Sequence, residues 1–87
     1  MPTIEGAIIT EQGVTFAVAI VRPSTLNSPP ECESAIRAFS AVFGGLPTII
    51  MAQDSQGVPS YYGRRDLVDF MASVPLEAVS WSRYQVN

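Results

Sequence analysis

The stretch Thr48-Ile49-Ile50-Met51-Ala52-Gln53-Asp54 decides the fold. Its apolar residues follow one another without alternation, and Gln53, Asp54 and then Gly57 end the run. A short apolar run bounded by turn residues is typical of a strand that is buried on both faces. One amphipathic stretch precedes it and another follows. Helix–strand–helix order of this kind indicates a small α/β domain built on parallel crossovers.

The N-terminal part of the chain is predicted to form a hairpin. Gln12-Gly13 separates two β-rich stretches, and a glycine in that position is a hairpin signal. A three-residue loop with Gly13 in a bulge would pair Ile8 with Phe16, whereas a two-residue turn would pair Ile9 with Phe16. We favour the first register because it gathers more large apolar side chains on one face. The two strands are then residues 3–11 and 14–22.

Two helices are predicted on either side of the central strand. Ser28 is a suitable N-cap, prolines occupy the first turn, and Gly44-Gly45 can end the first helix. Gly63 is a plausible N-cap for the second helix, which Pro75 ends. Residues 78–86, with aromatic and β-branched side chains, are predicted to form the last strand.

These elements follow one another in the order β-β-α-β-α-β. We therefore expect one small α/β (α+β) domain over residues 1–87, a two-layer sandwich. Its mixed four-stranded sheet would have the order 1-2-3-4, with both helices on one face. Right-handed crossovers that step the same way would produce this arrangement.

Composition and charge exclude several function classes. The chain carries a net charge of −3 and no histidine, so it lacks the basic footprint that nucleic acids and anionic membranes require. A single cysteine leaves no disulfide framework or thiolate metal cluster, and the missing histidine removes the common zinc sites and His-based triads. We expect no metal and no cofactor, and catalysis is the less favoured hypothesis. Without a signal-peptide pattern, the chain is expected to be cytoplasmic.

One candidate site is a small-molecule pocket. In open sheets with parallel strands, ligands bind beyond the carboxyl ends of the strands, where helix N-termini also point. That rule selects residues 22–28 and 53–65, and three of the five arginines lie in these loops. A small polar or anionic ligand would fit them. The candidate binding residues are Arg22, Asn27, Ser28, Ser55, Gln56, Tyr61, Arg64 and Arg65. Cys32, between two glutamates on an apolar helix face, is expected to be a packed core thiol.

The other candidate, and the preferred one, is a self-association surface. Apolar residues make up 47% of the chain and charged residues only 15%, which indicates apolar surface covered by a partner. With both helices on the bulky face of the sheet, the small face at Ala17, Ala19 and Val21 would be open. A homodimer or another protein partner would then cover it. The alternative is that a helix covers this face within one chain, in which case Ala17→Arg would unfold the protein.

Overall fold

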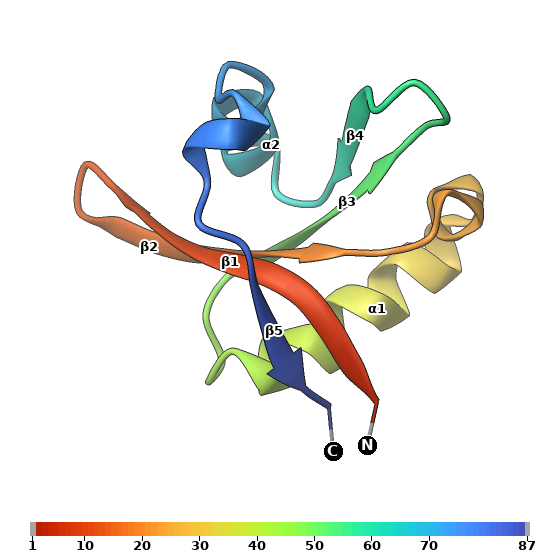
Figure 1. Ribbon diagram of the computed structural model, residues 1–87. Helices are drawn as coiled ribbons and strands as arrows, with labels where there is room; N and C mark the ends of the chain where they lie inside the picture. The colour runs from red at the N-terminus through yellow and green to blue at the C-terminus, as the bar shows by residue number, and fades with distance from the viewer. Residues whose placement is uncertain (1, 87) are drawn as a thin grey trace.

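The computed structural model describes residues 2–86 and contains a mixed five-stranded sheet with an α-helix on each face (Figure 1). The sheet order is β4-β3-β2-β1-β5, in which β2 and β3 are parallel and the other neighbours are antiparallel. Two 3₁₀ turns, η1 and η2, lead into α1 and follow α2. The elements are β1 (Thr3–Glu11), β2 (Val14–Ile20), η1 (Pro23–Asn27), α1 (Pro29–Val42), β3 (Thr48–Gln53), β4 (Pro59–Tyr62), α2 (Arg65–Ala72), η2 (Leu76–Ala78) and β5 (Ser82–Gln85).

The central strand is confirmed. β3 lies between β2 and β4, and Ile49, Ile50 and Met51 are each at most 1% exposed. Thr48, the one buried polar residue among residues 2–86, donates its hydroxyl to Leu46 O at 2.9 Å. A strand with neighbours on both sides and a helix over each face needs the continuous apolar run that the sequence provides.

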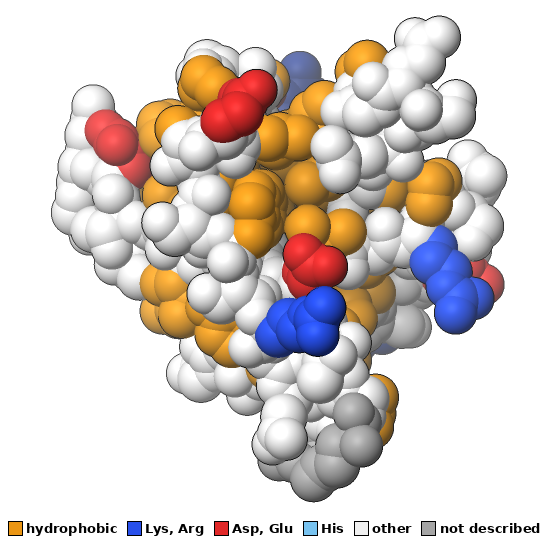
Figure 2. Space-filling model, in the orientation of Figure 1, with side chains coloured by type: hydrophobic (Ala, Val, Ile, Leu, Met, Phe, Trp, Pro, Cys, Tyr) orange, Lys and Arg blue, Asp and Glu red, His pale blue; other side chains and the backbone are white. Residues whose placement is uncertain are grey.

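One face of the sheet is covered by α2. Phe16, Val18, Ile49 and Met51 form a buried cluster with two α2 residues, Leu67 and Met71. The Phe16 and Phe70 rings meet edge to face at 6.2 Å, a favourable aromatic geometry. Because α2 is only eight residues long, it covers only part of this face. Figure 2 shows hydrophobic side chains still gathered between α2 and β4.

The opposite face is covered by α1, so the expected two-layer sandwich is wrong. Ala17 and Ala19 are fully buried in a cluster with Cys32 and Phe43, and Val21 packs partly buried against the same cluster. Short side chains on the strands allow the helix to approach closely, and large residues of α1 fill the remaining space. The fold is three-layered, and the sheet face predicted to be a self-association surface is interior.

The predicted start and end of α1 are confirmed. Ser28 is the N-cap and its hydroxyl accepts the Glu31 N–H, while prolines occupy the first two helical positions. Gly44 and Gly45 follow the helix with φ of 69° and 85°. This left-handed conformation, which suits glycine, stops the helix before β3.

The hairpin has the register that we did not favour. Gln12 and Gly13 form a two-residue turn with φ of 50° and 79°, and Ile9 lies opposite Phe16. Positive φ at both turn residues matches the twist of the two strands. Since helices cover both faces of the sheet, large side chains need not gather on one face. Ile8 therefore shares the α1 face with Ala17 and remains 49% exposed.

The C-terminal half adds an unexpected strand. Residues 59–62, expected to be a loop, form β4 and pair with β3, so the last strand cannot occupy that edge. It pairs instead with β1, over Ser82–Gln85, at the other edge of the sheet. The observed order is therefore not the expected 1-2-3-4. None of the helices in residues 2–86 is long and apolar enough to cross a membrane.

Candidate functional site

The two loops predicted to form a site do not converge as expected. β4 runs antiparallel to β3 and returns the chain to the opposite end of the sheet, where Gly63 and Arg64 lead into α2. Arg64 and Arg65 are therefore separated from the loop that follows β2. What remains at the carboxyl ends of β2 and β3 is η1, Ser28 and the turn between β3 and β4.

The arginines at the start of α2 are paired with carboxylates. Arg64 donates from Nε and Nη2 to the two carboxylate oxygens of Asp66, at 2.7 and 2.9 Å. The Nε of Arg65 lies 3.6 Å from Oδ1 of Asp69, one turn further along the helix. The hydrogen bonds from Arg64 lower the pKa of the Asp66 carboxyl and raise the pKa of the guanidinium.

This pair gives a direct pH prediction. Because the pKa of Asp66 is lowered in the folded state, its contribution to stability is present at neutral pH and is lost as the pH falls through that lowered value. We expect a carboxyl titration followed by NMR to place the Asp66 midpoint below that of an ordinary aspartate. Arg64→Gln should raise the midpoint, while Arg65→Gln should leave it unchanged. An equal response to both variants would contradict the assigned pair.

The start of α1 offers few free N–H groups. Pro29 and Pro30 have none, the Glu31 N–H is capped by Ser28 Oγ at 3.4 Å, and the Cys32 N–H donates to Ser28 O at 2.9 Å. Ser28, a candidate ligand residue, is thus engaged in capping the helix. An anion is not favoured here, because helix N-termini bind anions through unpaired N–H groups.

The turn between β3 and β4 is held by Asp54. Its Oδ1 accepts the N–H of Gln56 at 2.8 Å and of Val58 at 2.9 Å. Ser55 and Gln56 are exposed at the tip of this turn and line none of the depressions found near it. Their role is explained by the turn alone.

A hollow of about 420 Å³ lies between η1 and the β3–β4 hairpin. Of the eight predicted ligand residues it brings together two, Asn27 and Tyr61, which are 34 positions apart in the chain. The other residues that line the hollow were not predicted, because residues 58–62 were treated as a loop and the β3–β4 hairpin beside η1 was not foreseen. The additional lining residues are Pro23, Leu26, Ala52, Gln53, Asp54, Ser60 and Tyr62.

The hollow opens where β2 and β3 separate. Val21 N–H donates to Met51 O at 2.8 Å, but Pro23, two residues further on, has no N–H for Gln53 O. The Asp54 N–H donates to Val58 O, on the β4 side of β3. The main-chain groups of successive strand residues point to opposite sides, so the N–H and C=O of Gln53 point toward β2. Within residues 2–86, no main-chain hydrogen bond joins Gln53 to residues 21–23.

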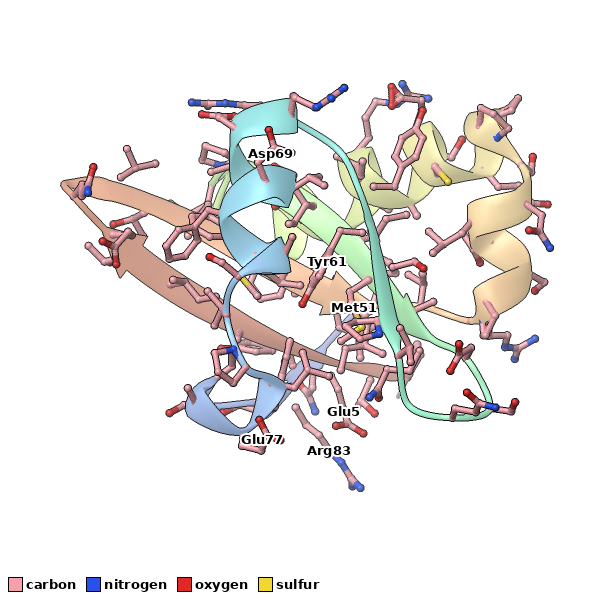
Figure 3. The ribbon with its side chains drawn as sticks, turned by 90° about the horizontal axis from the view of Figure 1, so that it is seen from above. Glu5, Met51, Tyr61, Asp69, Glu77 and Arg83 are labelled. Atoms are coloured by element: carbon pink, nitrogen blue, oxygen red, sulfur yellow. The ribbon has the colours of Figure 1, made fainter. Side chains whose placement is uncertain are left out.

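Tyr61 links the hollow to the core. It lies opposite Met51 in the sheet, and its ring packs against the cluster beneath α2 (Figure 3). Its hydroxyl is buried without a hydrogen-bond partner among the described residues, and this desolvation raises the pKa of the phenol. Tyr61 therefore lines the hollow from β4 while its ring packs with the core cluster beneath α2.

Cys32 has a structural role in the core. Cys32 is fully buried, as expected, and its thiol donates to Thr25 O at 3.2 Å. Burial, followed by the charges of Glu33 and Glu31, raises the pKa of this thiol. Among residues 2–86, no three His, Cys, Asp or Glu side chains group as metal ligands would.

No protein-family model, curated protein or solved structure matches this chain.

Proposed function

We propose that the hollow between η1 and the β3–β4 hairpin binds a small neutral molecule with an amide-like edge. The supporting observation is that Gln53 lines the hollow and that its main chain makes no hydrogen bond to residues 21–23, where β2 and β3 separate. Asn27 lines the same space, and its side-chain amide can supply a further donor and acceptor. A carboxamide or lactam offers the complementary pair of groups.

The size and walls of the hollow agree with this occupant. Its volume falls within the range of about 300–1,000 Å³ that is usual for small-molecule sites. Pro23, Leu26 and Tyr62 supply apolar and aromatic walls around the polar groups, and Leu26 and Tyr62 pack against the same core cluster. Few polar groups within a mostly apolar lining is the usual composition of such sites.

Charge argues against the anionic ligand that the arginines had suggested. Among the described residues that line the hollow, Asp54 alone is charged. Arg22 lies on a different depression with Thr25 and Phe39, and Arg64 is paired with Asp66 at the other end of β4. A carboxylate ligand would therefore meet an aspartate and no compensating cation.

The matched probes benzamide and benzoate test the proposal. They share one ring and differ in whether an amide or a carboxylate is presented. In ¹H–¹⁵N NMR titrations, benzamide should shift the amide signals of Asn27, Gln53 and Tyr61, and benzoate should shift them far less. Signals that move elsewhere, or move equally for both probes, would contradict the proposal.

The Asn27→Asp variant refines this test. It keeps the shape of the side chain but replaces its donor with a charge, and we expect benzamide affinity to fall about three- to tenfold, as for one lost hydrogen bond. Gln56→Glu is the matched control, because it makes the same chemical change on the exposed turn outside the hollow. Equal affinity in the two variants would remove Asn27 from the site.

A further inference from the structure

β1 has an open edge next to the hairpin turn. β5 pairs with β1 only from Thr3 to Gly6, so residues 7–11 have β2 on one side and no strand on the other. Figure 1 shows the tip of the β1–β2 hairpin extending past β5. Unpaired edges of this kind are sites at which another strand can add.

The hydrogen-bonding pattern identifies which groups are open. Glu11 and Val14 flank the two-residue turn and form a hydrogen-bonded pair, so by alternation Ile9 and Ala7 also face β2. At the other end, Val86 N–H donates to Pro2 O at 3.0 Å, which places the even-numbered residues of β1 on the β5 side. The N–H and C=O of Ile8 and Thr10 therefore point outward, and no described segment bonds to them.

The other two edges of the sheet are protected. On the outer side of β4, Pro59 lacks an N–H, and the strand is four residues long. On the outer side of β5, the charged Arg83 faces away from β1, and this strand is equally short. The open edge of β1 carries no proline, its one charged residue, Glu11, lies at the end beside the turn, and Ile8 leaves its side chain 49% exposed there.

We propose that two copies of this chain pair antiparallel through the open edge of β1, with Ile9 on the two-fold axis. Ile8 of each copy then exchanges both main-chain hydrogen bonds with Thr10 of the other, which satisfies all the open groups. In a register centred on Ala7, Ile8 would pair with Gly6 of the other copy and would displace β5 from it. In a register centred on Thr10, Ile8 would pair with Gln12, which lies in the turn. The sheet would continue across the two copies.

Side chains agree with this register. Ile8 lies beside Thr10 of the other copy on the α1 face, and β-branched neighbours suit adjacent strands. Glu11 lies opposite the small Ala7. The two Glu11 side chains are four residues apart along the strands, or about 14 Å, which exceeds the Debye length of ~8 Å at physiological salt. The edge is short, so the pair should be a weak, concentration-dependent dimer.

Proline scanning of the edge tests this dimer. Sedimentation velocity from micromolar to millimolar concentration should show a monomer–dimer equilibrium in the natural chain. Thr10→Pro should abolish it, because proline removes one outward N–H and its ring blocks the approaching strand. Gln85→Pro is the matched control, since it places proline on the protected outer side of β5, and it should dimerise as the natural chain does.

Two further variants separate pairing from folding. Thr10→Val loses the hydroxyl bond to Thr15 but keeps the N–H, and should still dimerise. If Thr10→Pro does not fold, Ile8→Lys places a charge at the same edge and should yield a folded monomer. A natural chain that is monomeric at millimolar concentration, or a dimer that survives Ile8→Lys, would overturn the proposal.

Discussion

The Ala17→Arg variant is expected to be unfolded under conditions in which the natural chain is folded. Ala17 is fully buried between the sheet and α1, in the same cluster as Ala19 and Phe43. An arginine there would either carry an unpaired charge into the core or push the helix off the sheet. Either outcome lowers the free energy of unfolding by several kcal/mol, which is comparable with the total of about 5–15 kcal/mol for an ordinary domain.

Circular dichroism and thermal unfolding measure this effect. Ala38→Arg is the matched control, because it makes the same substitution on the exposed side of α1 and should change stability by less than about 0.5 kcal/mol. A folded Ala17→Arg variant with a natural melting temperature would show that α1 does not cover this face.

The Gly63→Ala variant should also lower the free energy of unfolding strongly. Gly63 joins β4 to α2 with a φ of 146°, a conformation that residues with a side chain rarely adopt. A Cβ at this position would lie 2.7 Å from Ile49 Cγ2 and 3.2 Å from Ile49 Cα, within the packed centre of β3. Backbone strain and overpacking each cost about 1–3 kcal/mol, so we expect a loss of about 2–6 kcal/mol.

Gly44→Ala separates the two causes. Gly44 also has a positive φ, 69°, but a Cβ there would meet nothing within 4 Å. Its replacement should therefore cost only the conformational part, about 1 kcal/mol. Urea unfolding of the two variants gives the comparison, and equal losses would contradict the close approach of Gly63 to β3.

The sequence predicted best where local chemistry determines structure. Ser28 with two prolines after it, and the glycine pair at 44–45, define α1 by capping alone. The unbroken apolar run at residues 49–52 identifies a buried strand without reference to its neighbours. Both predictions are confirmed for this reason.

The errors arose where a choice between two faces or two edges was needed. β2 is apolar on both faces, and its sequence does not say which helix covers which. The structure places large α1 residues over Ala17 and Ala19, and α2 over Phe16 and Val18, so that volumes complement each other. Periodicity finds the buried side of a helix but not the sheet face that receives it.

The prediction of the candidate site was wrong mainly because β4 was not predicted. Pro59-Ser60-Tyr61-Tyr62 is short and begins with proline, which favoured a loop, although proline is acceptable on an edge strand. Its aromatic residues and the turn around Gly57 were the available signals of a hairpin. Without β4, Arg64 and Arg65 were placed at the wrong end of the sheet, and the hollow beside Gln53 could not be foreseen.

The placement of the two helices on opposite faces is the feature on which this account of the fold most depends, because it makes the predicted self-association surface interior. A nuclear Overhauser spectrum tests it most directly. The methyl groups of Ala17 and Ala19 should show contacts to Cys32 and Phe43, while those of Val18 and Ile49 should show contacts to Leu67 and Met71. Contacts from α1 to Val18 instead, with none to Ala17 and Ala19, would contradict the three-layer fold.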